Sequence, residues 1–207
     1  KFGIYFNRAN NGSLINNSIV TLGGSSHGIA MVSSSSNNVS NNTVITNGSL
    51  ASGIWMDDGF FGHSIRNNII MTNGSGYGIE SGTTNFISHS IIFAHNTITI
   101  FSNGQGFFVR KLNSSNIFNN TIVTYGTNAH AIQLLDFNFS TISYNNISTL
   151  YNGIGIVTAR TYYSIIANNT IKTFNGTGMS IRATYFSNFT NNIIIASDKF
   201  GRGIEFD

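Results

Sequence analysis

The fold is decided by Asn-Asn-Thr-Val-Ile-Thr at residues 41–46, a stretch that returns about every 25 residues along the chain. Close copies are Asn-Asn-Ile-Ile-Met-Thr at 67–72, Asn-Asn-Thr-Ile-Val-Thr at 119–124 and Asn-Asn-Thr-Ile-Lys-Thr at 168–173. The general pattern is an apolar residue, two variable residues, an asparagine, one residue and then usually Ile or Val. The repeated asparagines, spaced 25, 26, 28, 24, 25, 24 and 23 residues apart, are Asn17, Asn42, Asn68, Asn96, Asn120, Asn145, Asn169 and Asn192.

A second marker keeps the same period. It is usually a glycine followed by an apolar residue, and it occurs at Gly3, Gly28, Gly53, Gly78, Gly106, Ala131, Gly155, Gly178 and Gly203. Two independent markers that stay in phase along the whole chain indicate a structural repeat.

Within each repeat the apolar residues alternate with polar ones, which is typical of strands with one buried face. Such short strands cannot bury their apolar faces alone, but stacked coils pair each strand with its equivalents about 4.8 Å above and below. A buried asparagine can then pass amide hydrogen bonds from coil to coil. The sequence therefore predicts an all-β parallel β-helix of about eight coils in a single domain, residues 1–207, right-handed because parallel crossovers almost always are.

The motifs Asn41-Asn42-Thr43-Val44 and Asn168-Asn169-Thr170-Ile171 resemble the right-handed parallel β-helix repeat family, the pectate-lyase-like superfold with NosD-type repeats. The resemblance covers the whole chain and is specific for the fold. Its members include polysaccharide lyases and hydrolases, periplasmic accessory proteins and many surface proteins, so the resemblance implies several functions.

Composition excludes other classes of protein. Charged residues make up 8% of the chain, against roughly 25% in typical soluble proteins. The net charge of +3 is spread thinly, which argues against a nucleic-acid partner, and the chain has no cysteine for thiolate chemistry. No apolar run approaches the roughly 20 residues that span a membrane. Thirteen Asn-x-Ser/Thr triplets permit glycosylation.

The sequence predicts no catalytic site, no metal site and no cofactor. Lyases of the family that the chain resembles typically hold calcium with clustered acids, whereas this chain has seven acids in all. Asp58 and Asp136 fall in one column but three coils apart, roughly 14 Å, which is too far for one ion. Lys111, Asp136 and Arg160 occupy one column and are interpreted as an exposed salt ladder. The five histidines are dispersed, and His63 is expected to be a hydrogen-bonded core residue.

One group of outward residues is a candidate carbohydrate-binding patch. Trp55 is expected beside Glu80 of the next coil and Phe108 of the one after, with Asp57 and Arg110 in the neighbouring column. Aromatic faces beside acids and an arginine suit sugars, and a spacing of roughly 8 Å between the Cα atoms of Asp57 and Glu80 is compatible with the carboxylate pair of inverting glycosidases. Four extra residues between Gly78 and Asn96 are expected to bulge near this patch. The alternative is that the two aromatic residues cover a loop or a neighbouring subunit.

A second group suggests assembly. Three residues after the repeated asparagine, an outward column is mostly apolar, which is unusual for a soluble monomer. Its apolar members are Val20, Ile45, Met71, Val123 and Ile195. The alternative is a stripe covered by loops or glycans of the same protein.

These patterns favour a structural module of a secreted or cell-surface assembly, such as a filament, sheath or adhesin, located outside the cell. The expected partner is a second copy, associated end to end or laterally, or further coils of the same polypeptide if the chain is a segment of a longer solenoid. End-to-end stacking is expected because both termini fall at the same phase of the repeat. The alternative function is a carbohydrate-binding or polysaccharide-active β-helix, with a glycan as the ligand. A periplasmic accessory protein of the NosD kind is the third interpretation, and it would require metal ligands that the sequence does not show.

Overall fold

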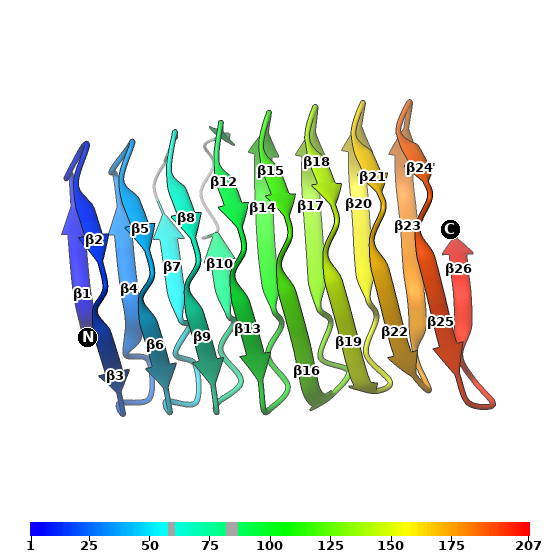
Figure 1. The fold of residues 1–207 in the computed structure, drawn as a ribbon, viewed down its shortest axis with the longest axis horizontal. Coiled ribbons are helices and arrows are strands. Elements are labelled where there is room, and N and C mark those ends of the chain that lie inside the picture. The colour runs from blue at the N-terminus through cyan, green and yellow to red at the C-terminus, as the bar shows by residue number, and fades with distance from the viewer. Residues whose placement is uncertain (58–60, 82–86) are drawn as a thin grey trace.

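The computed structural model describes residues 1–57, 61–81 and 87–207, which form a parallel β-helix of about eight coils with no helix among them (Figure 1). The predicted fold is therefore confirmed. In the described residues no helix exists that is long and apolar enough to cross a membrane.

Three parallel sheets run along the axis of the molecule, because successive coils add their strands to the same three sheets. The first sheet contains β1 (Phe2–Asn7), β4 (His27–Val32), β7 (Ile54–Asp57), β10 (Ile79–Ser81), β14 (Phe107–Asn113), β17 (Ile132–Asn138), β20 (Ile156–Tyr162), β23 (Thr177–Tyr185) and β26 (Arg202–Phe206), with β11 (Ser88–His89) beside β14. The second sheet contains β2 (Ser13–Ile15), β5 (Asn38–Ser40), β8 (Ser64–Arg66), β12 (Ile92–Ala94), β15 (Asn116–Phe118), β18 (Thr141–Ser143), β21 (Ile165–Ala167) and β24 (Asn188–Thr190). The third sheet contains β3 (Ser18–Thr21), β6 (Thr43–Thr46), β9 (Ile69–Thr72), β13 (Thr97–Ile100), β16 (Thr121–Thr127), β19 (Asn146–Tyr151), β22 (Thr170–Phe174) and β25 (Ile193–Ser197).

The core is a column of aliphatic and aromatic side chains enclosed by the three sheets. The largest members are Phe93, Phe107 and Phe137, all fully buried. The rings of Phe93 and Phe107 meet edge to face, with centroids 5.5 Å apart. The glycine marker lies where the first sheet approaches the third most closely. A Cβ atom on Gly78 would stand 2.4 Å from Ile98 Cγ2 and 2.6 Å from the carbonyl oxygen of Gly106, so a side chain does not fit there.

The eight repeated asparagines form one hydrogen-bonded column. In each link, the backbone N–H and the Nδ2 of one asparagine both donate to Oδ1 of its equivalent in the next coil, and the Nδ2–Oδ1 distances are 2.9–3.1 Å. The other Nδ2 hydrogen reaches a carbonyl of the preceding coil, as from Asn120 to Phe93 at 3.0 Å. Neighbouring coils thus satisfy the amide groups of the internal asparagines, from Asn42 to Asn169, which explains a polar column inside the core.

Left-handed residues make the corners of each coil. The residue before the ladder asparagine has a positive φ in every coil, for example 55° at Asn41 and 52° at Asn119. Asparagine tolerates this conformation better than most residues. The Asn-Asn pairs of the sequence therefore combine two roles, because the first asparagine turns the chain and the second joins the ladder.

A second polar column follows another left-handed corner, and only His63 of this column was predicted to be buried. The backbone N–H of Ser115 donates to Ser140 Oγ at 3.0 Å, and that of Ser140 donates to Ser164 Oγ at 3.2 Å. His63 occupies the same column, and its Nδ1 accepts the N–H of Asn37 at 3.1 Å. Burial lowers the pKa of His63 to about 4, so the ring is neutral at physiological pH. The expectation that His63 is a hydrogen-bonded core residue is confirmed.

We expect that Asn120→Leu destabilises the protein strongly. The change removes the acceptor of the backbone N–H and Nδ2 of Asn96, and one donor each from Asn145 Oδ1 and the carbonyl of Phe93. The cost is about 1–3 kcal/mol for each buried group that stays unsatisfied. Urea unfolding of both proteins measures the difference. Asn116→Leu, the same change at an exposed position of β15, is the matched control and should cost less than about 0.5 kcal/mol. Equal stability of the two variants would contradict the role given to the ladder.

Candidate functional site

The predicted carbohydrate patch lies on the outer face of the first sheet. Glu80 of β10 is paired with Trp55 of β7 on one side and with Phe108 of β14 on the other, so three successive coils place these side chains in a row. The alignment deduced from the repeat is therefore the one that the strand pairing gives. We call the set Trp55, Asp57, Glu80, Phe108 and Arg110 the aromatic–acid patch.

Trp55 is half-buried against other aromatic rings. Its indole stacks on the ring of His27 at 5.1 Å between centroids and lies 6.1 Å from the ring of Phe2. The residue beside Trp55 in the preceding coil is Ala30, whose short side chain leaves room for the indole. His27 and Phe2 were not predicted as part of the patch, because they lie in a neighbouring column of the sheet.

Phe108 differs from expectation, because its side chain is only 7% exposed. Tyr77 stacks on the ring with centroids 4.9 Å apart, and the guanidinium carbon of Arg110 lies 4.6 Å from the ring centroid. Phe108 therefore does not offer an open face to a ligand. It supports Arg110, whose exposed guanidinium is held over the ring by a cation–π contact.

Glu80 is the partly buried acid of the patch. Its Oε2 accepts a hydrogen bond from Ser52 Oγ at 2.5 Å, and Ser52 Oγ also accepts the N–H of Tyr77 at 3.3 Å. Burial raises the pKa of Glu80 above its ordinary value, and the charge of Asp57 raises it further, against the opposing effects of the Ser52 hydrogen bond and of Arg110. The patch thus combines an indole, a carboxyl group that is costly to ionise and an exposed guanidinium.

Two sequence predictions fall on residues outside those that the structure describes. They concern Asp58, which was compared with Asp136 as a metal ligand, and residues 82–86 within the segment between Gly78 and Asn96 that was expected to bulge. Asp57 is the last residue of β7, and its charge is near enough to Glu80 to affect the pKa of that group.

The charged column predicted as a salt ladder lies at another corner of the same sheet. Arg160 donates to both oxygens of Asp136, from Nε at 2.6 Å and from the terminal nitrogen Nη2 at 2.9 Å. The hydrogen bonds and charge of Arg160 lower the pKa of Asp136, and Lys111 stands beside Asp136 in the preceding coil. Since both partners are largely exposed, such a pair contributes at most about 1 kcal/mol.

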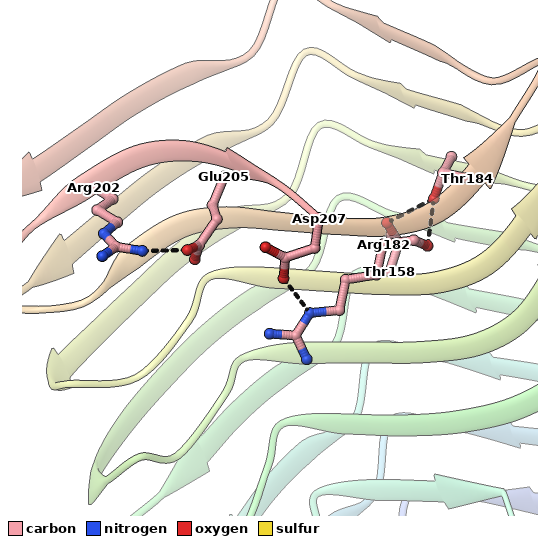
Figure 2. Close-up of polar contacts among 6 residues, drawn as sticks. All are labelled: Thr158, Arg182, Thr184, Arg202, Glu205 and Asp207. Carbon is pink, nitrogen blue, oxygen red and sulfur yellow. Dashed lines mark hydrogen bonds and ion pairs between the residues drawn. The ribbon is translucent and has the colours of Figure 1, made fainter.

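Similar surface pairs continue into the last coils (Figure 2). Arg182 donates from Nε to Asp207 at 2.8 Å, and Arg202 pairs with Glu205. Thr184 donates to the carbonyl of Arg182 at 3.1 Å on the same face. These contacts are those of an ordinary solvated surface.

The apolar column also lies where the repeat placed it. Its members align on the outer face of the third sheet, from Val20 in β3 to Ile195 in β25. Val20 is 56% and Ile195 49% exposed, while Ile45, Met71 and Val123 are half-buried. A cavity of about 240 Å³ opens at the last coils of this column, lined by Lys172, Phe174 and Ile195 among others. We call Val20, Ile45, Met71, Val123 and Ile195 the apolar stripe.

One sequence family matches the chain. The profile described as "Periplasmic copper-binding protein (NosD)" matches residues 1–126. No curated protein and no solved structure matches significantly.

The described residues do not fit a copper site. Copper in proteins is bound by cysteine, methionine and histidine side chains, and no group of three or more His, Cys, Asp or Glu converges in the part of the chain that the structure describes. Met31, Met56 and Met179 are buried among the aliphatic residues of the core. The Nδ1 atoms of His27 and His130 each accept a backbone N–H, at 3.0 and 3.1 Å.

The match spans residues 1–126 of 207, more than half of the chain, and the coils that it covers continue without a change of architecture to β26. This chain therefore belongs to the NosD family of periplasmic parallel β-helix repeat proteins.

Proposed function

We propose that this domain is a structural module of a periplasmic or cell-surface assembly, in which copies associate side by side through the apolar stripe. The proposal assigns no catalytic activity to the domain. The single observation that carries it is the alignment of five aliphatic or methionine side chains on one outer face over the length of the third sheet.

The construction of the third sheet supports this proposal. Eight parallel strands hold this column in one register on a surface that is already ordered. Five coils contribute the apolar side chains of the stripe, and the other three contribute Thr99, Ser148 and Lys172. Association of such a surface loses less conformational entropy than association of a mobile one. Exposed apolar surface that extends over many residues also marks contact sites more often than isolated apolar residues do.

A second function, glycan binding at the aromatic–acid patch, is favoured by one observation. Glu80 is kept in a position where burial and the charge of Asp57 both oppose its ionisation. Acids that are held at such a cost concentrate at functional sites. The partly exposed indole of Trp55 and the guanidinium of Arg110 flank this acid, and together they suit the apolar faces and hydroxyl groups of a sugar.

Replacement of Ile45 and Met71 together by serine should weaken self-association, because it removes two of the three stripe residues that lie in adjacent coils. Sedimentation velocity over a concentration series should show association of the native domain and at least a tenfold weaker constant for the variant, equivalent to about 1.4 kcal/mol. Ile15 and Ile165, exposed on the second sheet, provide the matched control when both are changed to serine. A native domain that stays monomeric throughout the series would contradict the lateral contact, as would an equal loss in the control.

Trp55→Ala should abolish glycan binding if the patch is a sugar site. We expect retention of the native domain in gels that contain a soluble β-glucan, galactan or chitosan, and loss of that retention in the variant. Tyr125→Ala removes an exposed ring that stacks on Phe101 away from the patch and should leave retention unchanged. Absence of retention in all three gels argues against the site. Release of reducing ends that disappears in Asp57→Ala would contradict the absence of catalysis.

Glu80→Gln should stabilise the domain at pH 8 and have little effect below pH 4. Because the folded state raises the pKa of Glu80, this group contributes most stability below its unfolded-state pKa of roughly 4.3. That contribution is lost as the pH rises through the folded-state pKa. Glutamine is always neutral and therefore escapes the loss. Thermal unfolding of both proteins between pH 3.5 and 8 measures the difference, and a variant that is less stable at pH 8 would show that Glu80 gains more from its contacts than its burial costs.

A further inference from the structure

A concave feature of the first sheet lies outside both the aromatic–acid patch and the apolar stripe. It is a cavity of about 350 Å³ lined by Ile87, Lys111, Asn113, Asp136 and Asn138. Strand pairing aligns Lys111 with Asp136 and Asn113 with Asn138 in adjacent coils. Ile87, which directly precedes β11, belongs to the coil before them. The lining thus comes from three successive coils.

A left-handed corner produces this cavity. Lys111 has a φ of 52° and Asp136 a φ of 57°, so the chain bends at the same position in both coils. Leu112 and Phe137 follow these corners and are fully buried in the core. The next residues, Asn113 and Asn138, face the cavity again. Each coil therefore contributes a charged side chain and an amide, separated by a buried residue.

Lys111 supplies the positive charge that a ligand in the cavity can pair with. Both carboxylate oxygens of Asp136 are already bonded by Arg160. Lys111 takes part in no ion pair among the residues that the structure describes. A ligand in this cavity therefore meets an ammonium group that makes no direct ion pair with the described residues, beside an acid whose two oxygens Arg160 already holds.

The amide of Asn113 requires a hydrogen-bond donor. Its Oδ1 is buried and has no hydrogen-bond partner within the described residues. By contrast, Asn138 Oδ1 accepts the backbone N–H of Tyr162 at 2.9 Å. Asn113 lines the cavity. A buried carbonyl oxygen without a donor costs about 1–3 kcal/mol, and a ligand hydroxyl group that reaches this oxygen from the cavity would remove that cost.

We propose that this cavity binds a small hydroxylated carboxylate, a molecule of the sugar-acid class. Its carboxylate pairs with Lys111, a neighbouring hydroxyl donates to Asn113 Oδ1, and its carbon skeleton lies against Ile87. The bond from Lys111 to the carboxylate is charge-assisted, and the bond from the neighbouring hydroxyl to Asn113 is a neutral hydrogen bond. The cavity volume is at the lower end of the range for small-molecule sites. The proposal is independent of lateral assembly and of the aromatic–acid patch.

Isothermal titration with three probes tests the chemistry. Gluconate carries both groups, acetate carries only the carboxylate, and galactose carries only hydroxyls. We expect gluconate to bind at least tenfold more tightly than either of the other two, and its affinity to fall as sodium chloride is raised, because the ion pair is screened. No binding of gluconate at about 10 mM, a concentration well above that of useful weak sites, overturns the proposal. Equal binding of acetate or galactose also overturns it.

Variants locate the binding. Lys111→Gln and Asn113→Ala should each weaken gluconate binding at least tenfold, whereas Lys111→Arg should retain it because the charge remains. Lys172→Gln makes the same change on the third sheet and is the matched control. Far-ultraviolet circular dichroism and the unfolding midpoint establish whether each variant is folded. If Lys111→Gln does not fold, the binding measured with Asn113→Ala decides the test. Binding that survives both substitutions, or that falls equally in Lys172→Gln, would place the ligand elsewhere.

Discussion

The fold depends on the side-chain amide of a buried asparagine, which has two donors and one acceptor that must all be satisfied away from water. A single coil cannot do this. Between Asn17 and Asn192, each amide donates forward to the next asparagine of the ladder and, in every coil after the first, backward to a carbonyl of the preceding coil. The buried asparagine is therefore satisfied only when a neighbouring coil lies in register with its own. The aliphatic core and the three sheets follow from that stacking.

The sharp corners of the coils explain why the sequence contains few charged residues, since little of each coil lies in exposed loops. Because left-handed residues turn the chain within one position, each coil needs few exposed loop residues, and the strands of adjacent coils meet along nearly their whole length. The corners also aim side chains. At Asn41 and Asn119 they direct the following asparagine into the core, and at Lys111 and Asp136 they direct charged groups outward around a cavity. One backbone conformation therefore serves both the interior and the surface.

The sequence predicts the architecture well because periodicity records which residues are equivalent. The spacing between the glycine marker and the repeated asparagine, such as Gly106 and Asn120, is sufficient to align the strands of successive coils. It therefore places Trp55 beside Glu80 and reveals the apolar stripe. It could not predict that Phe108 is covered, since that depends on Tyr77 in a neighbouring column and on the direction taken by Arg110. The serine column was missed because serine is abundant everywhere in the chain. The cavity beside Lys111 depends on backbone conformation, which periodicity alone does not reveal.

The ladder has a consequence for how such a protein changes in length. The two sides of each internal coil present complementary patterns of donors and acceptors, so a duplicated segment of about 25 residues would find matching neighbours wherever it is inserted in phase. It would lengthen the molecule by about 4.8 Å without altering its cross-section. An insertion of one or two residues within a strand would instead turn buried side chains outward. Tandem duplication and loss of whole coils are therefore the changes that this architecture tolerates best, and the length of the molecule can evolve in discrete steps.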